Sequence, residues 1–314
     1  MIALGAAMLI ACGSKKVENN PADQPVSSAI ENPVEFNADS AYAYIQAQVD
    51  FGPRVPNSEA HRKTSEWLDR KLREFGGSVS VQSARLTAFD GTPLNAKNII
   101  AQYNPEETDR TLLVAHWDSR PWADADPDIA KHSIPVDGAN DGASGVGVIL
   151  ELARQFSLKN PGKGVDILFV DAEDYGSEGD DDSWALGAQY FVNHPFKPGY
   201  RPARVILLDM VGGENATFRR EFFSQQNYPD LCDEIWSVAA ASGYRNYFLN
   251  KLGGAVNDDH IHFIKSGIPA IDIIDYREDT GFHPAWHTSA DNMQVISRPT
   301  LKAVGQTLIN YIYR

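Results

Sequence analysis

The sequence lacks a long apolar segment, an excess of basic residues and a framework of cysteines. No stretch approaches the roughly 18 consecutive apolar residues of a membrane-spanning helix, although 43% of the 314 residues are hydrophobic. The formal net charge is −14, and no basic stripe is present to neutralise the phosphates of a nucleic acid. These absences exclude a polytopic membrane protein and a nucleic-acid-binding protein. The length fits one large domain.

Only two cysteines are present, Cys12 and Cys232. Cys12 ends a short apolar segment, Leu9-Ile10-Ala11-Cys12, which is typical of a signal peptide and resembles a bacterial lipobox. In such lipoproteins the cysteine carries the lipid and begins the mature chain. The alternative is a poorly packed N-terminal tail. We expect residues 1–12 to be a lipoprotein signal peptide with a lipidated Cys12, and an enzyme anchored in the bacterial cell envelope as a periplasmic or outer-membrane lipoprotein. Cys232 would then have no disulfide partner.

The rest of the chain divides into a tether and one domain. Residues 13–36 are polar and lack periodicity, which indicates a flexible tether. Residues 37–314 alternate between amphipathic stretches and short β-branched apolar runs. We expect helices over residues 41–51, 58–75, 145–156, 184–192, 231–241 and 300–313, and strands over residues 79–86, 98–103, 112–115, 165–170, 205–208 and 270–274. This alternation predicts an α/β single domain with a mostly parallel central sheet flanked by helices on both faces.

Acidic residues and histidines follow the predicted strands. His116 follows residues 112–115, the pair Glu173 and Asp174 follows residues 165–170, and Asp209 follows residues 205–208. Asp141 lies in a glycine-rich turn before a helix, and His287 comes after the last strand. Because ligands of such sheets bind beyond the carboxyl ends of the strands, these side chains are expected to meet. Carboxylates and imidazoles are ligands of Zn²⁺, and a catalytic zinc keeps one position open.

Each of these residues also has a simpler interpretation. Asp141 alone would serve as a helix cap. Glu173 and Asp174 would serve as a solvated strand end, and His116 as a hydrogen-bonded core histidine. All of them would have to fall at one sheet edge by accident, so the combination favours a metal site.

The ordered set, with adjacent Glu173 and Asp174, resembles the co-catalytic zinc aminopeptidase family and its relatives, the glutaminyl cyclases. The resemblance covers residues 98–292. It implies that Glu173 transfers protons and that Asp141, Asp174 and His287 hold the zinc common to both branches. His116 and Asp209 match the ligands of the second zinc of the aminopeptidases.

Three features resemble the cyclase branch more closely. The segment Asp258-Asp259-His260-Ile261-His262-Phe263 is similar to a cyclase segment, and aminopeptidases usually have serine where Asp258 stands. Trp184 and Trp286 match tryptophans that line the cyclase pocket. The stretch from His116 to Arg120 also resembles the cyclases. Two departures from the animal enzymes are Ala115, where they have a disulfide cysteine, and Asp174, where they have glutamate.

The resemblance therefore predicts a zinc-dependent glutaminyl-peptide cyclotransferase, an acyltransferase that converts N-terminal Gln of peptides to pyroglutamate. One zinc is expected, Glu173 would be the proton shuttle, and Asp258 and Asp209 would assist it. Trp184 and Trp286 would bind the substrate. We expect a monomer that acts on peptides or proteins with N-terminal Gln and contacts the membrane only through its lipid.

Two other functions remain open at this point. A two-zinc aminopeptidase would use His116 and Asp209 as further ligands, and a non-catalytic lipoprotein would retain only a relict peptide- or sugar-binding site. The acidic run Glu178 to Asp182 is interpreted as a solvated loop, with a calcium site as the alternative.

Overall fold

The computed structural model describes residues 1–2, 34–277 and 281–314. Cys12 and most of the predicted tether lie outside the described residues. Phe36, which we assigned to the tether, is 1% exposed and packs against Gly305, where an added Cβ would lie 2.2 Å from its ring. The packed part of the chain therefore includes residue 36, one position before the expected domain start.

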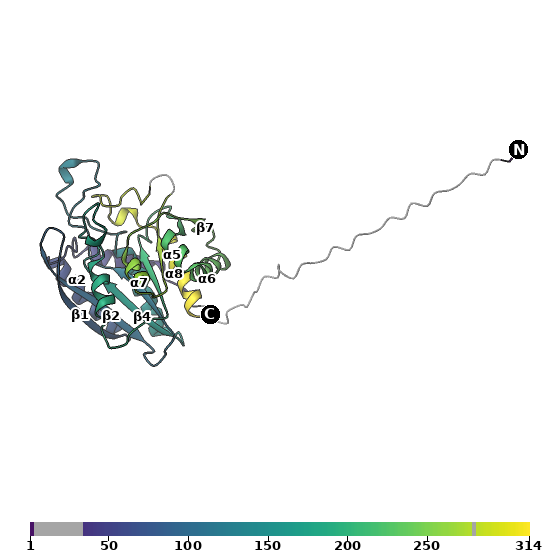
Figure 1. Cartoon of the computed structure of the whole chain (residues 1–314), viewed down its shortest axis with the longest axis horizontal. Helices are drawn as coiled ribbons and strands as arrows, with labels where there is room; N and C mark the ends of the chain where they lie inside the picture. The colour runs from purple at the N-terminus through teal and green to yellow at the C-terminus, as the bar shows by residue number, and fades with distance from the viewer. Residues whose placement is uncertain (3–33, 278–280) are drawn as a thin grey trace. The chain divides into compact units, whose positions relative to one another are not determined.

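A six-stranded sheet forms the centre of the domain, in the order β1-β2-β4-β3-β5-β8. Figure 1 shows β1, β2 and β4 side by side at one end of this sheet. The pairs β3–β4, β3–β5 and β5–β8 are parallel, which confirms the predicted mostly parallel sheet. The strands are β1 (Ser78–Thr87), β2 (Pro93–Tyr103), β3 (Arg110–His116), β4 (Gly164–Val170), β5 (Arg204–Asp209) and β8 (Ala270–Ile274).

Two strand pairs are antiparallel, β1–β2 and β2–β4. The chain turns between β1 and β2 within residues 88–92, where Ala88 N donates to Thr92 O at 2.9 Å. So short a connection joins only antiparallel strands, because a parallel pair needs a crossover of a dozen or more residues. The apolar run 98–103 alone does not reveal this direction, since a strand covered on both faces is apolar whichever way it runs.

Helices cover both faces of the sheet, as expected. Along the inner strands, alternate residues enter two separate cores. In β3, Leu113 and Ala115 face the larger core, while Leu112 and Val114 face the smaller one. The larger core is closed by α1 (Ala38–Val49), α2 (Glu59–Glu74), α3 (Ala143–Leu158), α6 (Pro229–Ala241) and α8 (Arg298–Ile312), and the smaller by α4 (Leu186–Asn193) and α7 (Asp259–Lys265).

Side-chain caps explain where several helices begin. Asn37 accepts from Ser40 N at the start of α1, and Ser58 accepts from His61 N at the start of α2. Each satisfies a backbone donor that would otherwise lack a partner in the first turn. Asp141 does not cap α3, whose N-cap is Gly142 without a side-chain hydrogen bond. The Asp141 carboxylate is therefore available for another role.

Four short elements after β5 were not expected from the sequence. They are β6 (Phe218–Arg220), α5 (Phe222–Asn227), β7 (Phe248–Leu252) and α7. Strands β6 and β7 form a separate two-stranded sheet. None of the helices in the described part of the chain is long and apolar enough to cross a membrane.

Candidate active site

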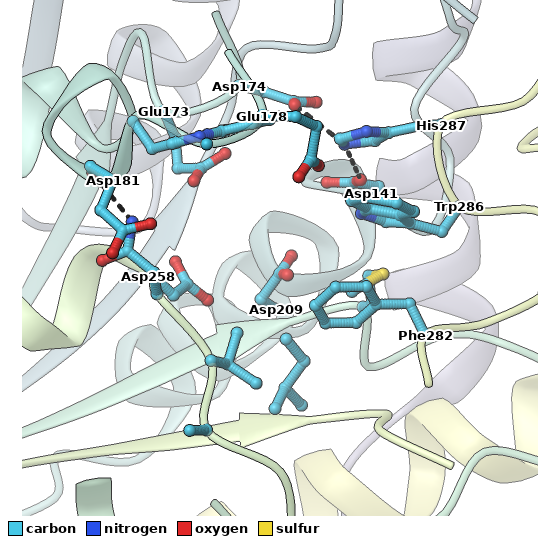
Figure 2. Close-up of a pocket in the computed structure, with 17 residues that line it drawn as sticks. Asp141, Glu173, Asp174, Glu178, Asp181, Asp209, Asp258, Phe282, Trp286 and His287 are labelled. Carbon is cyan, nitrogen blue, oxygen red and sulfur yellow. Dashed lines mark hydrogen bonds and ion pairs between the residues drawn. The ribbon is translucent and has the colours of Figure 1, made fainter. Parts of the chain in front are cut away.

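The parallel strands deliver the predicted residues to one pocket. His116 and Asp209 are the last residues of β3 and β5, and Glu173 and Asp174 follow β4. Figure 2 shows the pocket with acidic side chains around its centre. Its volume is about 210 Å³, below the usual 300–1,000 Å³ of small-molecule pockets, so it suits a single side chain. The lining includes all eight predicted catalytic, substrate-binding and metal residues: Asp141, Glu173, Asp174, Trp184, Asp209, Asp258, Trp286 and His287.

Asp141, Asp174 and His287 form a first group of candidate metal ligands. One ligand atom from each lies within 4.8 Å of the others, and all three residues are buried. His287 Nε2 lies 3.1 Å from Asp174 Oδ1 and 3.6 Å from Asp141 Oδ2. Asp174 Oδ1 nevertheless has no hydrogen-bond partner among the described residues. Two buried carboxylates and an imidazole that converge in this way are a ligand set that suits Zn²⁺.

His116, Asp141 and Asp209 form a second group with the same compactness. His116 Nε2 lies 3.0 Å from Asp141 Oδ1 and 3.2 Å from Asp209 Oδ1. Asp141 thus presents one oxygen to each group, as a carboxylate between two metals would. The donors of a second metal site are therefore present together, and geometry alone does not decide between one zinc and two.

Left-handed backbone conformations surround this pocket. Of the non-glycine residues with positive φ in the described part of the chain, three are asparagines, which tolerate this region. The other four are His287 itself, at φ 53°, and the neighbours of three pocket residues: Ala172 before Glu173, Ala185 after Trp184, and Met210 after Asp209. Such strain costs of order 1–3 kcal/mol per residue and persists where the surrounding structure enforces it, commonly at functional sites.

Asp118 positions the acidic pair and was not among the predicted site residues. Its two oxygens accept from the backbone N–H groups of Glu173, at 3.1 Å, and Asp174, at 3.2 Å. Asp118 Oδ1 also lies 3.6 Å from His116 Nδ1. One buried carboxylate therefore holds the strand end and also lies beside the imidazole. In the sequence, Asp118 is marked only by its position in the stretch from His116 to Arg120 that resembles the cyclases.

Asp291 and Arg54 hold the turn that carries Asp141. The oxygens of Asp291 accept from Asn140 N at 2.8 Å and Asp141 N at 3.1 Å. Arg54 is fully buried and donates to the carbonyls of Asp137 and Gly138. Neither residue lies near the turn in the sequence, so no local pattern marked them.

Arg120 and Asp124 support the other side of the site. Arg120 Nη1 donates to Asp174 O at 3.1 Å, and its guanidinium lies 4.7 Å from the centre of the Trp184 ring. Asp124 Oδ1 lies 3.7 Å from His287 Nδ1, on the ring edge opposite the candidate metal. Carboxylates in this position orient metal-ligating histidines. Arg120 and Asp124 also form an ion pair with each other.

The acids of the pocket have unusual proton affinities. Burial, and then the charges of Asp174 and Asp258, raise the pKa of Glu173 well above its ordinary value. Burial also raises the pKa of Asp209, to about 7, and that of Asp258. Proton transfer is most efficient when the pKa of the transferring group lies near the working pH, and burial shifts the pKa values of these acids upward in that direction.

Two tryptophans flank the candidate ligand His287. Trp286 stacks on the His287 imidazole at a centroid distance of 3.6 Å, and Trp184 lies parallel to it at 5.9 Å. Gly176 makes room for Trp184, because a Cβ there would lie 2.1 Å from the indole. Both rings line the pocket and supply an apolar surface beside its carboxylates.

Behind Asp258 lies a buried group that the sequence analysis did not single out. His260 Nε2 lies 3.1 Å from Glu221 Oε2, and His260 Nδ1 lies 3.9 Å from Asp272 Oδ2. Asp258, His260 and Asp272 bring their polar atoms within 4.8 Å of one another. The imidazole thus lies among the carboxylates of Glu221, Asp258 and Asp272.

Comparison with known proteins identifies both glutaminyl cyclases and an exopeptidase as relatives. The family described as peptidase family M28 matches residues 98–312. The structure of the Bacteroides thetaiotaomicron glutaminyl cyclase bound to N-acetylhistamine has a TM-score of 0.89 at 48% identity, covering 90% of this chain and 99% of that chain. A Zn-dependent exopeptidase from Parabacteroides distasonis has a TM-score of 0.87 at 52% identity, with the same coverage of both chains.

A curated relative is more distant. The glutaminyl-peptide cyclotransferase of Bos taurus is 27% identical over 240 residues, which cover 67% of this chain and 64% of the bovine protein. The chain thus matches slightly less than two thirds of this relative but nearly all of the two bacterial structures. The names of these relatives divide between a transferase and an exopeptidase.

Proposed function

The chain belongs to peptidase family M28, and from this premise we propose that it cyclises the N-terminal glutamine of peptides to pyroglutamate with release of ammonia. The observation that carries the proposal is the pairing of two buried acids, Glu173 and Asp258, in a pocket with room for one side chain. The aminopeptidase branch usually has serine where Asp258 stands. The likeness to the cyclase from Bacteroides thetaiotaomicron supports the same branch.

The reaction joins two parts of one residue. The α-amine of the substrate attacks the γ-carbonyl carbon, a C–N bond forms to close the ring, and the bond to the amide nitrogen breaks. Asp141, Asp174 and His287 would hold a zinc ion, which when bound would act as a Lewis acid toward that carbonyl. Glu173 takes the proton from the amine and returns it to the departing nitrogen, which leaves as ammonia.

The remaining residues bind and orient. Trp184 and Trp286 form apolar walls around the glutamine side chain and hold the amine near the carbonyl, which raises their effective concentration. Asp258 and Asp209 hold the migrating proton and the leaving group through charge-assisted hydrogen bonds. Because the nucleophile belongs to the substrate, no second metal is needed to activate water, and we propose one zinc per chain.

The second candidate function is a two-zinc aminopeptidase. The compact group of His116, Asp141 and Asp209 favours it. Incubation with an N-terminal Gln peptide and with a leucine amide separates the two functions. Ammonia with a cyclised product supports the cyclase, whereas free leucine without cyclisation contradicts it and supports the peptidase.

Asp258→Asn provides a test within the site. Asp258 Oδ1 accepts from Asp259 N and caps α7, and asparagine is an equally good cap. We therefore expect normal folding and zinc content, with kcat for cyclisation lowered at least about a hundredfold, within the usual range for proton transfer. Asp258→Ser is expected to be comparably slow and to gain no peptidase activity. A near-parental rate for Asp258→Asn would remove Asp258 from the mechanism.

We also propose that Cys12 anchors the enzyme to the cell envelope. The support is the sequence ending Leu9-Ile10-Ala11-Cys12. Cys12→Ser is expected to move the protein from the membrane to the soluble fraction and to remove the acyl chains from its mass. Unchanged fractionation and an unchanged mass would rule the anchor out.

A further inference from the structure

The acidic run Glu178 to Asp182 borders the pocket rather than pointing only into solvent. Glu178 and Asp181 line the pocket, whereas Asp180 and Asp182 do not. Figure 2 shows Asp181 at the side of the pocket near Asp258, and the Glu178 carboxylate over the space between Glu173 and Asp141. All four acids of the run are exposed, and none of them belongs to a group of candidate metal ligands in the described chain.

Hydrogen bonds fix this loop in place through its backbone. Asn257 Nδ2 donates to Asp181 O at 2.9 Å and Gln189 Nε2 donates to Asp182 O at 2.8 Å. Ser183 Oγ donates to Asp180 O at 2.6 Å. Since the acceptors are carbonyl groups, the carboxylates of Glu178 and Asp181 take no part in holding the loop. Asn257 also ties the loop to the neighbour of Asp258.

The mouth of the pocket has charge of one sign. Its lining contains seven acids and no lysine or arginine. Arg120 lies behind the Trp184 ring and pairs with Asp124. Within the described residues, neither Glu178 nor Asp181 has an ion-pair partner. Zinc would offset the negative charge of Asp141 and Asp174 beside His287. It would leave the carboxylates of Glu178 and Asp181, which we call the rim carboxylates, without a cation.

Asp258, at the floor of the same pocket, gives independent evidence that the pocket binds a ligand. Asp258 is 4% exposed and its Oδ2 has no hydrogen-bond partner among the described residues. The Asp258 carboxylate faces into the cavity (Figure 2). A buried polar atom without a partner is costly, and a bound substrate amine or amide would satisfy it. The rest of the substrate chain must then leave past the rim.

We propose that Glu178 and Asp181 make the enzyme select glutaminyl peptides in which a lysine or arginine follows soon after the N-terminal glutamine. This inference rests on the proposed cyclase function and defines its substrate class. The first side chain occupies the pocket floor, so the next residues reach the rim. There a cationic side chain meets two unpaired carboxylates on a backbone-held loop, and an anionic side chain meets repulsion.

The test compares matched peptides that differ only in the second and third residues, Gln-Lys-Lys, Gln-Ser-Ser and Gln-Glu-Glu. One exposed ion pair is worth up to about fivefold in affinity. With attraction for one peptide and repulsion for the other, we expect kcat/KM to favour Gln-Lys-Lys over Gln-Glu-Glu at least about tenfold. The difference should lie mainly in KM, because the contact is made equally in the ground and transition states. It should shrink as salt is raised.

The variants carry equal changes of charge in one loop. Glu178→Gln with Asp181→Asn removes the two rim carboxylates and should reduce the preference to near unity. Asp180→Asn with Asp182→Asn removes two neighbouring charges away from the pocket and should keep both the preference and the parental rates. Neither pair removes a backbone acceptor that pins the loop, and thermal unfolding checks the folding of both.

The outcomes separate the inference from the proposed function. Equal kcat/KM for all three peptides in the parent, or an equal loss of preference in both double variants, overturns the role of the rim while leaving the cyclase intact. A parent that cyclises none of the peptides overturns the proposed function and the inference with it.

Discussion

Glu173→Gln is expected to retain zinc and to lose nearly all cyclisation. The carboxylate is buried in the pocket and close enough to Asp174 and Asp258 for their charges to raise its pKa. Glutamine has nearly the same shape but cannot accept the proton of the attacking amine. General acid–base catalysis contributes roughly 10²–10⁴-fold, and here one group serves both transfers. We therefore expect kcat to fall by at least about a thousandfold.

The structure explains why zinc should remain. Backbone N–H groups of Glu173 and Asp174 are held by Asp118, and the substitution changes neither. The Glu173 side chain is outside the group formed by Asp141, Asp174 and His287. Zinc content by atomic absorption and the rate of ammonia release are the two measurements.

Glu173→Asp is the matched control. Aspartate keeps the carboxylate, but its side chain is one methylene shorter. We therefore expect partial activity and full zinc content. A zinc-free Glu173→Gln protein would place Glu173 among the metal ligands instead. Parental turnover in Glu173→Gln would assign the proton transfer to another group, with Asp258 as the next candidate.

The central sheet and the pocket residues that follow its strands could be predicted because both depend on one regularity, whereas Trp184, Trp286 and Asp258 were expected only from the resemblance to the cyclases. Parallel strands of this sheet end at a common edge, so residues that directly follow the strands, such as His116, Glu173 and Asp209, must lie near each other. The apolar runs that mark β3, β4, β5 and β8 are long enough to recognise without tertiary information. Their positions in the chain then placed the acids that come after them.

The missed elements lacked such a signal. The strand β6 has three residues and the helices α5 and α7 have six and seven. Segments this short have little periodicity, and packing decides their conformation. The chain direction of β2 was missed because burial on both faces removes the alternation that distinguishes antiparallel strands.

The supporting residues of the site were missed for a different reason. Asp291 accepts from the backbone of Asn140 and Asp141, about 150 residues earlier in the chain. Arg54 donates to carbonyl groups of the same turn. In both cases the partner is a backbone N–H or carbonyl group. Every residue type carries these groups, so only the fold reveals which side chain pairs with which turn. Asp124 beside His287 is a further case.

His287→Ala is expected to release zinc, whereas His116→Ala is expected to retain it. His287 is one of three candidate protein ligands of the first group, and its Nε2 lies 3.1 Å from Asp174 Oδ1. Three is the usual number for a catalytic zinc, so the loss of one leaves two carboxylates that bind zinc weakly. Asp141→Ala and Asp174→Ala are expected to lose zinc in the same way, and cyclisation should vanish in all three variants.

His116 distinguishes one zinc from two. Its Nε2 lies 3.0 Å from Asp141 and 3.2 Å from Asp209, as in a second metal site. If one zinc is present, His116→Ala should keep one zinc per chain. His194→Ala is the matched control, because it removes an exposed imidazole away from the pocket and should change neither zinc nor rate. A parent with two tightly bound zincs, of which His116→Ala loses one, would contradict the single-zinc proposal and favour the aminopeptidase. Full zinc in His287→Ala would contradict the ligand assignment itself.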